Sequence, residues 1–558
     1  MQPSKLAKRA WFLLFILIAA FYLYGLGHLP LVGPDEPRYA EVAREMFNRR
    51  DFVTPTLGGL PWFEKPALLY WLMIASYRVF GVDEFTARIG PAICGLATAA
   101  FVYWTAHTVS DRGNQTESPP PTVVMTELPR WSTLALVSSI SIIAFSRAAT
   151  FDIVITATIT AALSFFFVWD IRHRTAHVSE RVKWWLLPGF YVFIALSLLA
   201  KGLIGIVLPF GIIALYFVLR REWPRPFFKS LVWGLPLAIL LAATWYGPMT
   251  ARHGWVFIDQ FFIQHHFARF LTNKYRHPQP LYFYLLTLTW LMLPWTVFVV
   301  AAFVSARRWS WRGDNPVDRL RVFALAWLIA PVVFFSFSES KLAAYILPVV
   351  PAAALLVGER IDCALRAGKG ERVFRLTGTV LLILSAIGAW FAWHAMEASK
   401  FCAVGIVITP AGAGIAGLLL PRFRRPILIC FALSALVAGA VGLHCGAAVL
   451  GRRDSVRDLL AVAQQRGYGA TPIVQLFNIQ RTAEFYGAGR LTYRPDGEPK
   501  MLESAGEVAD AARRTGGTVL CIVPVQLEWQ LTAYRGLKSE ELARNDRVGL
   551  LVVRANSP

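Results

Sequence analysis

Apolar runs close to the length of a membrane span recur along the first part of the chain, separated by short polar connections. An α-helix needs about 20 residues to cross the hydrocarbon core of a bilayer. Thirteen runs meet or approach this length, and they fall near residues 11–29, 88–108, 131–148, 152–170, 184–200, 203–219, 230–248, 281–303, 321–337, 342–358, 375–395, 401–420 and 427–449. The pattern predicts an α-helical polytopic membrane protein with about 13 transmembrane helices.

One further apolar run, residues 66–81, is shorter than the others and carries Arg78. Charged residues flank it on both sides. We expect it to form a helix that lies on the membrane surface or dips into it, within a loop spanning residues 30–87. The first run follows a basic start but is not followed by a small-residue cleavage pattern, so we expect it to be a retained span.

The basic residues between the runs decide the orientation. With thirteen spans, one set of connections carries repeated bursts of Arg and Lys. These residues are Arg172, Arg174, Arg181, Lys183, Arg220, Arg221, Arg225, Lys229, Arg307, Arg308, Arg312, Arg360, Arg366, Lys369, Arg372, Arg422, Arg424 and Arg425. Basic connections remain in the cytoplasm, so this set and the N-terminus are predicted to be cytoplasmic. If residues 66–81 were counted as a span, the later basic connections would lie on the opposite side of the membrane from the basic N-terminus.

Composition supports the same class of protein. Hydrophobic residues make up 56% of the 558 residues and charged residues only 16%, whereas a soluble domain carries about 25% charge. The formal net charge of +21 could indicate nucleic-acid binding. The basic residues come in short bursts between apolar runs, however, and no nucleic-acid-binding module is visible. We therefore expect membrane lipids, and no nucleic acid, as partners.

The last segment, residues 451–558, is more polar than the rest of the chain. Its runs TPIVQLF and GTVLCIVP resemble strands, and SVRDLLAVAQQ has the apolar spacing of a helix. This alternation predicts a soluble α/β domain after a transmembrane catalytic domain of residues 1–450. The segment contains no glycine-rich phosphate loop and no obvious catalytic triad, so we expect a lid, docking or spacer role.

The chemically suggestive side chains fall on the connections opposite to the basic ones. Five separate connections contribute acids, bases, imidazoles or a phenol to this face. They hold Asp35, Glu36, Glu64, Lys65, Arg147, Asp152, Lys201, His253, Asp259, His265, His266, Arg269, Lys274, Arg276, Glu339, Lys341 and Tyr345. Ionised groups at the edge of the hydrocarbon core are costly and tend to mark sites. The sequence therefore predicts an active site at this membrane face.

Several of these residues also have a structural explanation. Asp35 and Glu36 precede Pro37, a favoured first helical residue, so one of the two acids would cap a helix. Asp152 stands similarly at the start of a span. His265 and His266 are adjacent and point about 100° apart on a helix. Together with Glu64 they would offer zinc or another divalent metal two imidazoles and a carboxylate; otherwise the histidines serve as hydrogen-bonding groups at the membrane edge.

Five motifs together resemble a bacterial GT-C glycosyltransferase. They are PDEPRYAEVAREM followed by FEKPALLYW, RAATFD, AKGLIG, HHFARF and SKLAAYILP. Within that superfamily, which is related to the protein O-mannosyltransferases, the chain is similar to the lipid A 4-amino-4-deoxy-L-arabinose transferase family. The similarity covers roughly residues 10–360 well and the later spans and external domain only by layout. Relatives often carry Glu-His where this chain has His265-His266, which weakens the metal hypothesis.

The resemblance implies a donor in which the sugar is linked to undecaprenyl phosphate, and a lipid A phosphate as acceptor. It places the reaction at the periplasmic face of a Gram-negative inner membrane and implies resistance to polymyxin-type cationic peptides. A leaving phosphate calls for fixed cations and hydrogen-bond donors. The candidates are Lys65, Lys201, Arg269, Lys341 and Tyr345. We expect Tyr345 to follow Lys341 by one helical turn.

The two aspartates receive the remaining roles in this hypothesis. Asp35 orients the acceptor or stabilises positive charge at the reacting sugar carbon, and Asp152 holds the ammonium group of the sugar. An alternative is a polyprenyl-phosphate-sugar transferase with a different sugar, or with a protein or glycan acceptor. A lipid or solute transporter is less favoured, because transporters usually place ionisable groups at mid-membrane and often show repeated halves. Here the mid-span positions are nearly free of charge and no repeat is visible.

Overall fold

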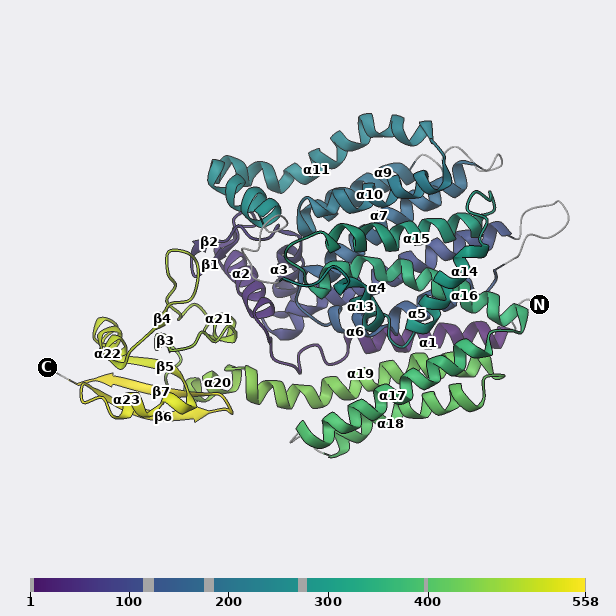
Figure 1. The fold of residues 1–558 in the computed structure, drawn as a ribbon. Coiled ribbons are helices and arrows are strands. Elements are labelled where there is room, and N and C mark those ends of the chain that lie inside the picture. The colour runs from purple at the N-terminus through teal and green to yellow at the C-terminus, as the bar shows by residue number, and fades with distance from the viewer. Residues whose placement is uncertain (1–4, 114–124, 175–184, 269–277, 396–399, 557–558) are drawn as a thin grey trace. The chain divides into compact units, whose positions relative to one another are not determined.

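A computed structural model describes residues 5–113, 125–174, 185–268, 278–395 and 400–556 of the chain. Helices form at all thirteen predicted apolar runs, and Figure 1 shows how they are arranged. Their bounds are α1 Lys5–Leu23, α4 Glu84–Gly113, α5 Leu128–Val137, α6 Ile140–Phe145, α7 Phe151–His173, α9 Leu186–Lys201, α10 Ile204–Arg220, α11 Arg225–Ile258, α13 Phe283–Leu291, α14 Thr296–Ser305, α15 Pro316–Ser336, α16 Val350–Ala367, α17 Glu371–Ala395, α18 Lys400–Leu419 and α19 Arg424–Asp454. The predicted helical class is confirmed.

Two of the predicted continuous spans are interrupted. Run 131–148 is divided between α5 and α6, and run 281–303 is divided between α13 and α14, whose axes differ by 119°. In the described part of the chain, seven helices are long and apolar enough to cross a membrane, or eight if α13 and α14 together form one broken span. Several shorter apolar helices, such as α9 and α10, accompany them. The total of thirteen spans stays a prediction.

The run at 66–81 forms α3, Leu68–Phe80, with 13 residues. At 1.5 Å per residue a helix of this length extends only about 20 Å, less than the roughly 30 Å of a hydrocarbon core. The expected short helix is therefore present, and its position on the membrane surface stays a prediction. It lies in a loop that also contains α2, Asp35–Arg49, and a small hairpin of β1, Thr56–Leu57, and β2, Leu60–Pro61.

The chain forms two compact units, and neither is a continuous segment. The first contains Met1–Tyr24, Glu64–Leu69 and Pro91–Gly442. The second contains Gly25–Phe63, Tyr70–Gly90 and Leu443–Pro558. The second unit thus combines most of the predicted outer loop 30–87 with the C-terminal segment. The division into catalytic and accessory domains at residue 450 stays a prediction.

The first unit is a helical bundle. Within it α7 packs against α9 and α10, α15 packs against α10 and α16, and α17 packs against α18. Helix α15 begins where Asn315 caps it: the side-chain carbonyl accepts a hydrogen bond from the Asp318 backbone N–H at 2.8 Å, and Pro316 fills the first helical position. Helix α7 also contacts the segment 343–349 that precedes α16. The ends of α7, α9 and this segment therefore lie together.

The second unit contains a mixed five-stranded sheet with the order β4-β3-β5-β7-β6. Its strands are β3 Ile473–Leu476, β4 Met501–Leu502, β5 Thr518–Pro524, β6 Leu537–Arg544 and β7 Val548–Ala555, and its helices include α20 Arg457–Gln465, α21 Thr482–Tyr486 and α22 Ala505–Arg514. Strands β3, β4 and β5 are parallel, and β6 and β7 run antiparallel to their neighbours. Residues of α22 pack on one face of the sheet, and residues of α20 on the other. The predicted α/β fold of the C-terminal segment is confirmed.

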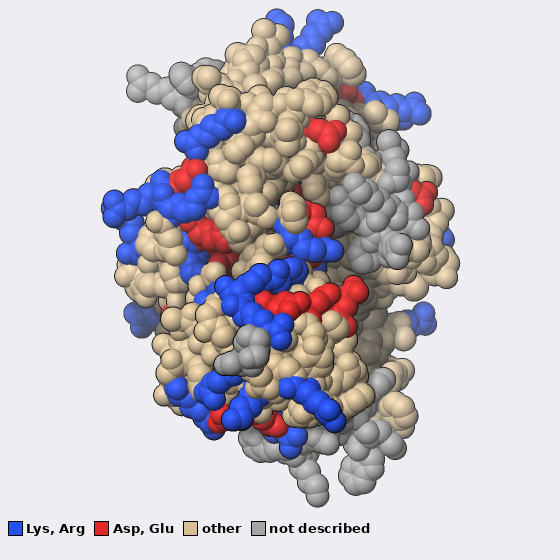
Figure 2. All heavy atoms as spheres, turned by 90° about the vertical axis from the view of Figure 1, so that its left-hand side faces the viewer, with Lys and Arg blue, Asp and Glu red and all other residues tan. Residues whose placement is uncertain are grey.

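The surface carries charges of both signs. On the face drawn in Figure 2, Lys and Arg side chains lie beside Asp and Glu side chains, with wide uncharged areas around them. Opposite charges on this face therefore compensate one another locally.

Candidate active site

Asp152 and Lys201 form an ion pair in the helical unit. Asp152 lies in the first turn of α7, and Lys201 is the last residue of α9. The Lys201 Nζ lies 2.5 Å from the Asp152 Oδ1, and the two side chains are 20% and 18% exposed. Since α7 and α9 pack together, the start of one helix meets the end of the other. The pair is thus held at one end of the bundle and is still open to solvent.

The local sequence explains why Lys201 is placed there. Gly202 ends α9 with φ 69° and ψ −144°, a conformation that L side chains rarely adopt. Thr150 is extended and precedes the first helical residue of α7, Phe151. The motifs AKG and ATFD therefore mark the two helix ends at which the cation and the carboxylate meet.

Tyr345 completes this group. Its ring lies under the Lys201 ammonium, 5.2 Å from Nζ to the ring centroid, within the range of a cation–π contact. A carboxylate and an aromatic ring from two other elements thus fix the position of the Lys201 cation. The structure brings together three of the predicted site residues, Asp152, Lys201 and Tyr345.

Lys341 precedes Tyr345 by four residues, but the two do not have the helical geometry that the sequence predicts. The expected helical turn from Lys341 to Tyr345 does not form, because Leu342 is extended and the 3-10 helix η3, Ala343–Val349, begins only after it. Lys341 is 8% exposed, and its ammonium donates a hydrogen bond to the Gln279 carbonyl at 3.0 Å. The expectation of a shared helical face is therefore wrong.

Asp35 and Glu36, in the second unit, have different environments. Asp35 is exposed in the first turn of α2. Glu36 is 6% exposed and receives two hydrogen bonds from the Arg88 guanidinium, at 3.0 and 2.8 Å. The Val32 backbone N–H also donates to Glu36. Neither acid acts as the N-cap of α2; Glu36 has a structural role, and Asp35 remains available for chemistry.

Arg88 is the residue that the sequence analysis did not identify. It is 1% exposed, and besides Glu36 it donates hydrogen bonds to the carbonyls of Leu26, Leu29 and Pro30. These contacts fix the segment that precedes Asp35. An arginine shortly after the charged start of α4 is the only sign of this role in the sequence.

The second unit also contains a network of charged groups between α2 and α21. Arg38 of α2 lies 3.5 Å from the Glu484 carboxylate of α21, and Arg481 donates to the same carboxylate at 2.9 Å. Burial raises the pKa of Glu41 to about 8, against the opposing effect of the neighbouring Arg44. The helix that carries Asp35 is thus held on its inner face by paired and buried carboxylates.

The remaining predicted residues are less completely described. Glu64 and Lys65 are half-buried and belong to the helical unit, as does His265, in the π-helix η1, Asp259–Ala268. Arg269 and the side chain of His266 lie outside the described residues. Arg147 donates hydrogen bonds to the carbonyls of Phe21 and Tyr24, so it has a structural role.

The predicted metal ligands lie only partly among the described residues. Within the described residues, no group of three or more His, Cys, Asp and Glu side chains is placed to hold a metal ion. Because the His266 side chain is not among them, the set of Glu64, His265 and His266 stays a prediction.

Known proteins resemble the chain over most of its length. A family model described as dolichyl-phosphate-mannose-protein mannosyltransferase matches residues 9–309. An undecaprenyl phosphate-α-4-amino-4-deoxy-L-arabinose arabinosyl transferase of Aeromonas hydrophila subsp. hydrophila is 31% identical over 406 residues, covering 70% of this chain and 68% of the relative. A protein of the same description from Pseudomonas aeruginosa is 29% identical over 452 residues, covering 78% and 77% of the two chains.

The fold is also that of a solved structure. The crystal structure of ArnT from Cupriavidus metallidurans bound to undecaprenyl phosphate matches with a TM-score of 0.78 at 22% identity, over 97% of this chain and 98% of that one. The family model and the curated relatives place the chain among the membrane glycosyltransferases of the GT-C class. More particularly, the chain belongs to the family of undecaprenyl phosphate-α-4-amino-4-deoxy-L-arabinose arabinosyl transferases, as its 31% identity to the Aeromonas relative shows.

Proposed function

We propose that this protein transfers 4-amino-4-deoxy-L-arabinose from undecaprenyl phosphate to phosphate groups of lipid A. The names of its relatives support the donor and the sugar. The observation that carries the proposal is the Lys201 ammonium, which the Asp152 carboxylate and the Tyr345 ring hold at an open end of the helical bundle. A fixed cation at the end of membrane-spanning helices suits a substrate with a lipid tail and a phosphate head.

Lys201 is suited to stabilise the leaving group. A lysine ammonium has three N–H donors and no acceptor; one donor is directed at Asp152, which leaves others for phosphate oxygens. As the bond to the sugar breaks, the donor phosphodiester becomes a phosphate monoester with additional negative charge. A preorganised cation stabilises this developing charge without reorganisation. Asp152 then acts as a positioning residue for Lys201, in place of the contact with the sugar ammonium expected from the sequence.

The other predicted cations extend the same phosphate site. Lys65, Lys341 and Arg269 supply further positive charge in this proposal, and the Tyr345 hydroxyl supplies a neutral donor. Arginine binds phosphate oxygens in a bidentate manner. The buried ammonium of Lys341, which already has one carbonyl partner at 3.0 Å, has two more N–H donors for a ligand.

The acceptor needs little activation. A phosphate monoester has a second pKa of about 6, so it is largely a dianion at neutral pH and requires no strong general base. A lipid A phosphate oxygen forms the new bond to the anomeric carbon while the bond to the donor phosphate oxygen breaks, and its electron pair leaves with undecaprenyl phosphate. This single displacement inverts the anomeric centre. The exposed Asp35 orients the acceptor or stabilises positive charge on the sugar.

The proposal places the reaction at the periplasmic face of a Gram-negative inner membrane, with the N-terminus in the cytoplasm. The positive-inside distribution of Arg and Lys supports this orientation. Attaching a cationic sugar to lipid A phosphate reduces the negative charge that attracts cationic peptides, so the expected physiological result is resistance to polymyxin. The predicted zinc or other divalent metal at Glu64, His265 and His266 is not part of the displacement proposed here.

The decisive experiment is an assay of the purified full-length protein with the radiolabelled undecaprenyl phosphate donor and defined lipid A acceptors. We expect labelled lipid A, identified by mass spectrometry, and a loss of about 100-fold or more in transfer for Asp35→Asn. Asp510→Asn removes a 62% exposed carboxylate of α22 and serves as the matched control with unchanged transfer.

Two results would contradict the proposal. Undiminished transfer by Asp35→Asn would remove the role given to Asp35. Transfer of a different sugar from its polyprenyl phosphate, with none from the aminoarabinose donor, would favour the alternative of another polyprenyl-phosphate-sugar transferase.

A further inference from the structure

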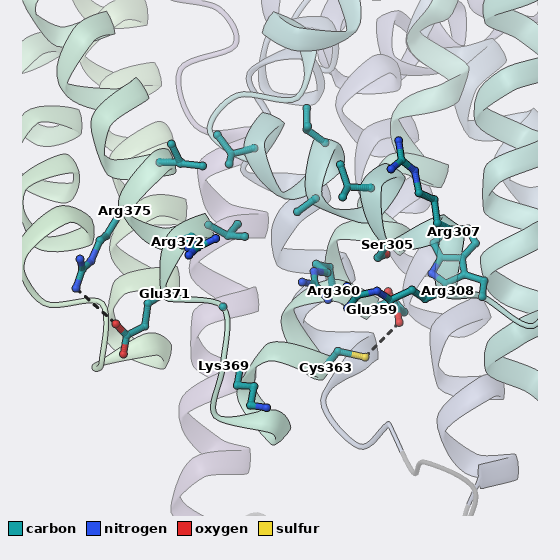
Figure 3. A pocket seen from close by; sticks show the side chains of 18 of the residues that line it. Ser305, Arg307, Arg308, Glu359, Arg360, Cys363, Lys369, Glu371, Arg372 and Arg375 are labelled. Carbon is teal, nitrogen blue, oxygen red and sulfur yellow. Dashed lines mark hydrogen bonds and ion pairs between the residues drawn. The ribbon is translucent and has the colours of Figure 1, made fainter.

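A charged cavity lies in the helical unit, and no step of the proposed reaction uses it. Its volume is about 1080 Å³, and it is lined by residues of α14, α15, α16, α17 and the 3-10 helix η2, Ala306–Arg308. Figure 3 shows its side chains in two groups: one from α14, η2 and α16, and one from α17 and the turn before it. We refer to this cavity as the basic pocket.

The lining of the basic pocket is strongly cationic. Seven basic side chains face two carboxylates, and they are Arg307, Arg308, Arg321, Arg360, Lys369, Arg372 and Arg375 against Glu359 and Glu371. Internal ion pairs neutralise both carboxylates: Arg321 donates to Glu359 at 2.9 Å, and Arg375 lies 3.5 Å from Glu371. The remaining positive charges are therefore uncompensated by the walls of the pocket.

Five basic residues are available to a ligand. Arg307, Arg308, Arg360, Lys369 and Arg372 form no ion pair with any residue that the structure describes. The Nε of Arg360 is moreover buried and has no hydrogen-bond acceptor within the described part of the chain. A buried N–H donor without a partner costs free energy, and an anionic ligand in the pocket would remove this cost.

One wall of the basic pocket is apolar and exposed. Val300 and Val304 of α14 are 53% and 63% exposed, and Leu376 of α17 is 56% exposed. Helix α17 is long and apolar enough to span a membrane. A ligand with both a negative head group and apolar chains would satisfy the cations and this wall together, whereas a soluble phosphate compound would leave the wall uncovered.

The basic pocket is distinct from the candidate active site. Arg360 lies ten residues into α16, about 15 Å along the axis at 1.5 Å per residue, whereas Tyr345 precedes the start of that helix. Similarly, Arg319 at the start of α15 bonds Asp170 at the end of α7, far from Asp152 at its beginning. The two sites thus lie toward opposite ends of the same helices, and the pocket belongs to the basic connections predicted to be cytoplasmic.

We propose that the basic pocket binds the phosphate head group of an anionic bilayer phospholipid, with the acyl chains lying along α14 and α17. Charge complementarity favours an anionic over a zwitterionic head group, because the cation of a choline or ethanolamine group would be repelled by five unpaired cationic side chains. Basic pockets between transmembrane helices on the cytoplasmic side are suited to such head groups. The lipid would anchor α17 to the bundle at this membrane face.

Native mass spectrometry of the detergent-solubilised full-length protein tests this proposal. The protein is titrated with phosphatidylglycerol or with phosphatidylcholine of the same acyl chains. We expect one phosphatidylglycerol to be retained preferentially, and this binding to weaken about tenfold or more in Arg308→Gln/Arg372→Gln. Both residues are exposed and unpaired within the described residues, so the variant is expected to fold. Arg360→Gln tests the buried donor separately.

The matched control is Arg225→Gln/Lys229→Gln, which removes two exposed charges from a different basic connection. It should bind phosphatidylglycerol like the unmodified protein. Equal retention of the two lipids, or an equal loss in the control and pocket variants, would overturn the proposal. Inorganic phosphate that competes as well as the lipid does would overturn the part assigned to the acyl chains. None of these results depends on sugar transfer.

Discussion

At the scale of single residues, the ion pair of Asp152 and Lys201 predicts that their contributions to catalysis are not independent. We expect Lys201→Gln to lower kcat/KM by about 100-fold or more, because the developing phosphate charge loses its cation. Asp152→Asn should cost about tenfold, since Lys201 remains but is less well positioned. The double variant should be no worse than Lys201→Gln alone, because a carboxylate without its cation has nothing left to orient.

Transfer kinetics with the purified protein check this prediction, with Lys229→Gln as the control for loss of a lysine charge. Losses that multiply in the double variant would show that Asp152 acts on the substrate directly, as the sequence-based hypothesis of a contact with the sugar ammonium requires. A change in kcat with little change in KM is expected for Asp152→Asn, because the carboxylate positions a group that acts mainly in the transition state.

The buried carboxylate of Glu41 predicts a pH-dependent stability. Its pKa is raised to about 8 by desolvation, whereas an unfolded glutamate titrates near about 4.3. Between these values the folded protein keeps a proton that the unfolded chain has released. The stabilising contribution is therefore fully present below about pH 4.3 and is lost as the pH rises through about 8, by up to roughly 1.4 kcal/mol for each pH unit.

Thermal unfolding followed by tryptophan fluorescence between pH 5 and pH 9 measures this effect. We expect the midpoint of unmodified protein to fall over this range and that of Glu41→Gln to fall less. Asp510→Asn is again the control, since it removes an exposed carboxylate. Parallel curves for the unmodified protein and Glu41→Gln would show that Glu41 is ionised in the folded state.

The sequence singled out Asp152, Lys201 and Tyr345, which the structure brings together, but the different roles of neighbouring residues could not be predicted. Asp35 and Glu36 are equivalent in the sequence, and only the fold places Arg88 beside Glu36. Likewise Lys341 and Tyr345 have helical spacing, yet Leu342 is extended. Such distinctions depend on contacts between distant residues and on backbone conformation, which local periodicity does not encode.

At the scale of elements, the Glu36–Arg88 pair predicts a strong coupling between the start of α2 and the start of α4. Both side chains are nearly inaccessible, and removing one leaves a buried charge without its partner. Either Glu36→Met or Arg88→Met should destabilise the protein by about 3–5 kcal/mol. The double variant should be less unstable than at least one single variant, because it leaves no isolated carboxylate or guanidinium.

Chemical denaturation of the detergent-solubilised variants measures this coupling. Asp35→Asn is the matched control on the same turn of α2, and its exposed side chain should leave stability unchanged within about 0.5 kcal/mol. A double variant whose loss equals the sum of the single losses would contradict the coupling.

The helical elements were the most predictable part of the fold. A membrane imposes apolar runs of fixed length, so all thirteen runs contain helices. The 119° bend between α13 and α14 could not be predicted from hydropathy, because residues 292–295 of the break are as apolar as the helices beside it. In the C-terminal domain, β3 and β5 coincide with the predicted strand-like runs, whereas β6 carries four charged residues among eight and gives little strand signal.

At the scale of the whole molecule, the grouping of distant segments could not be predicted. Residues 25–63 and 70–90 form one compact unit with residues 443–558, and the ion pair of Arg38 and Glu484 joins segments almost the length of the chain apart. Hydrophobic patterns place each segment in a membrane or in water, but they contain no information about which polar segments pack together. The charge pattern does, however, predict which segments share a side of the membrane.

The orientation of the chain is therefore the prediction on which the location of the active site depends. The first outer loop and the C-terminal domain share a compact unit, so they must lie on the same side of the bilayer. The basic connection between α14 and α15 should lie on the other side, because cytoplasmic connections retain Arg and Lys.

Alkaline phosphatase, which is active only outside the cytoplasm, should be active when fused after Gly59 or Pro558 and inactive when fused after Gly313. A green fluorescent protein fused at the same three positions should give the reciprocal pattern. Alkaline phosphatase activity after Gly313 would reverse the predicted orientation. The Asp152–Lys201 pair lies at the opposite end of its helices, so it would then face the cytoplasm. A lipid A acceptor in the periplasm could not reach it there.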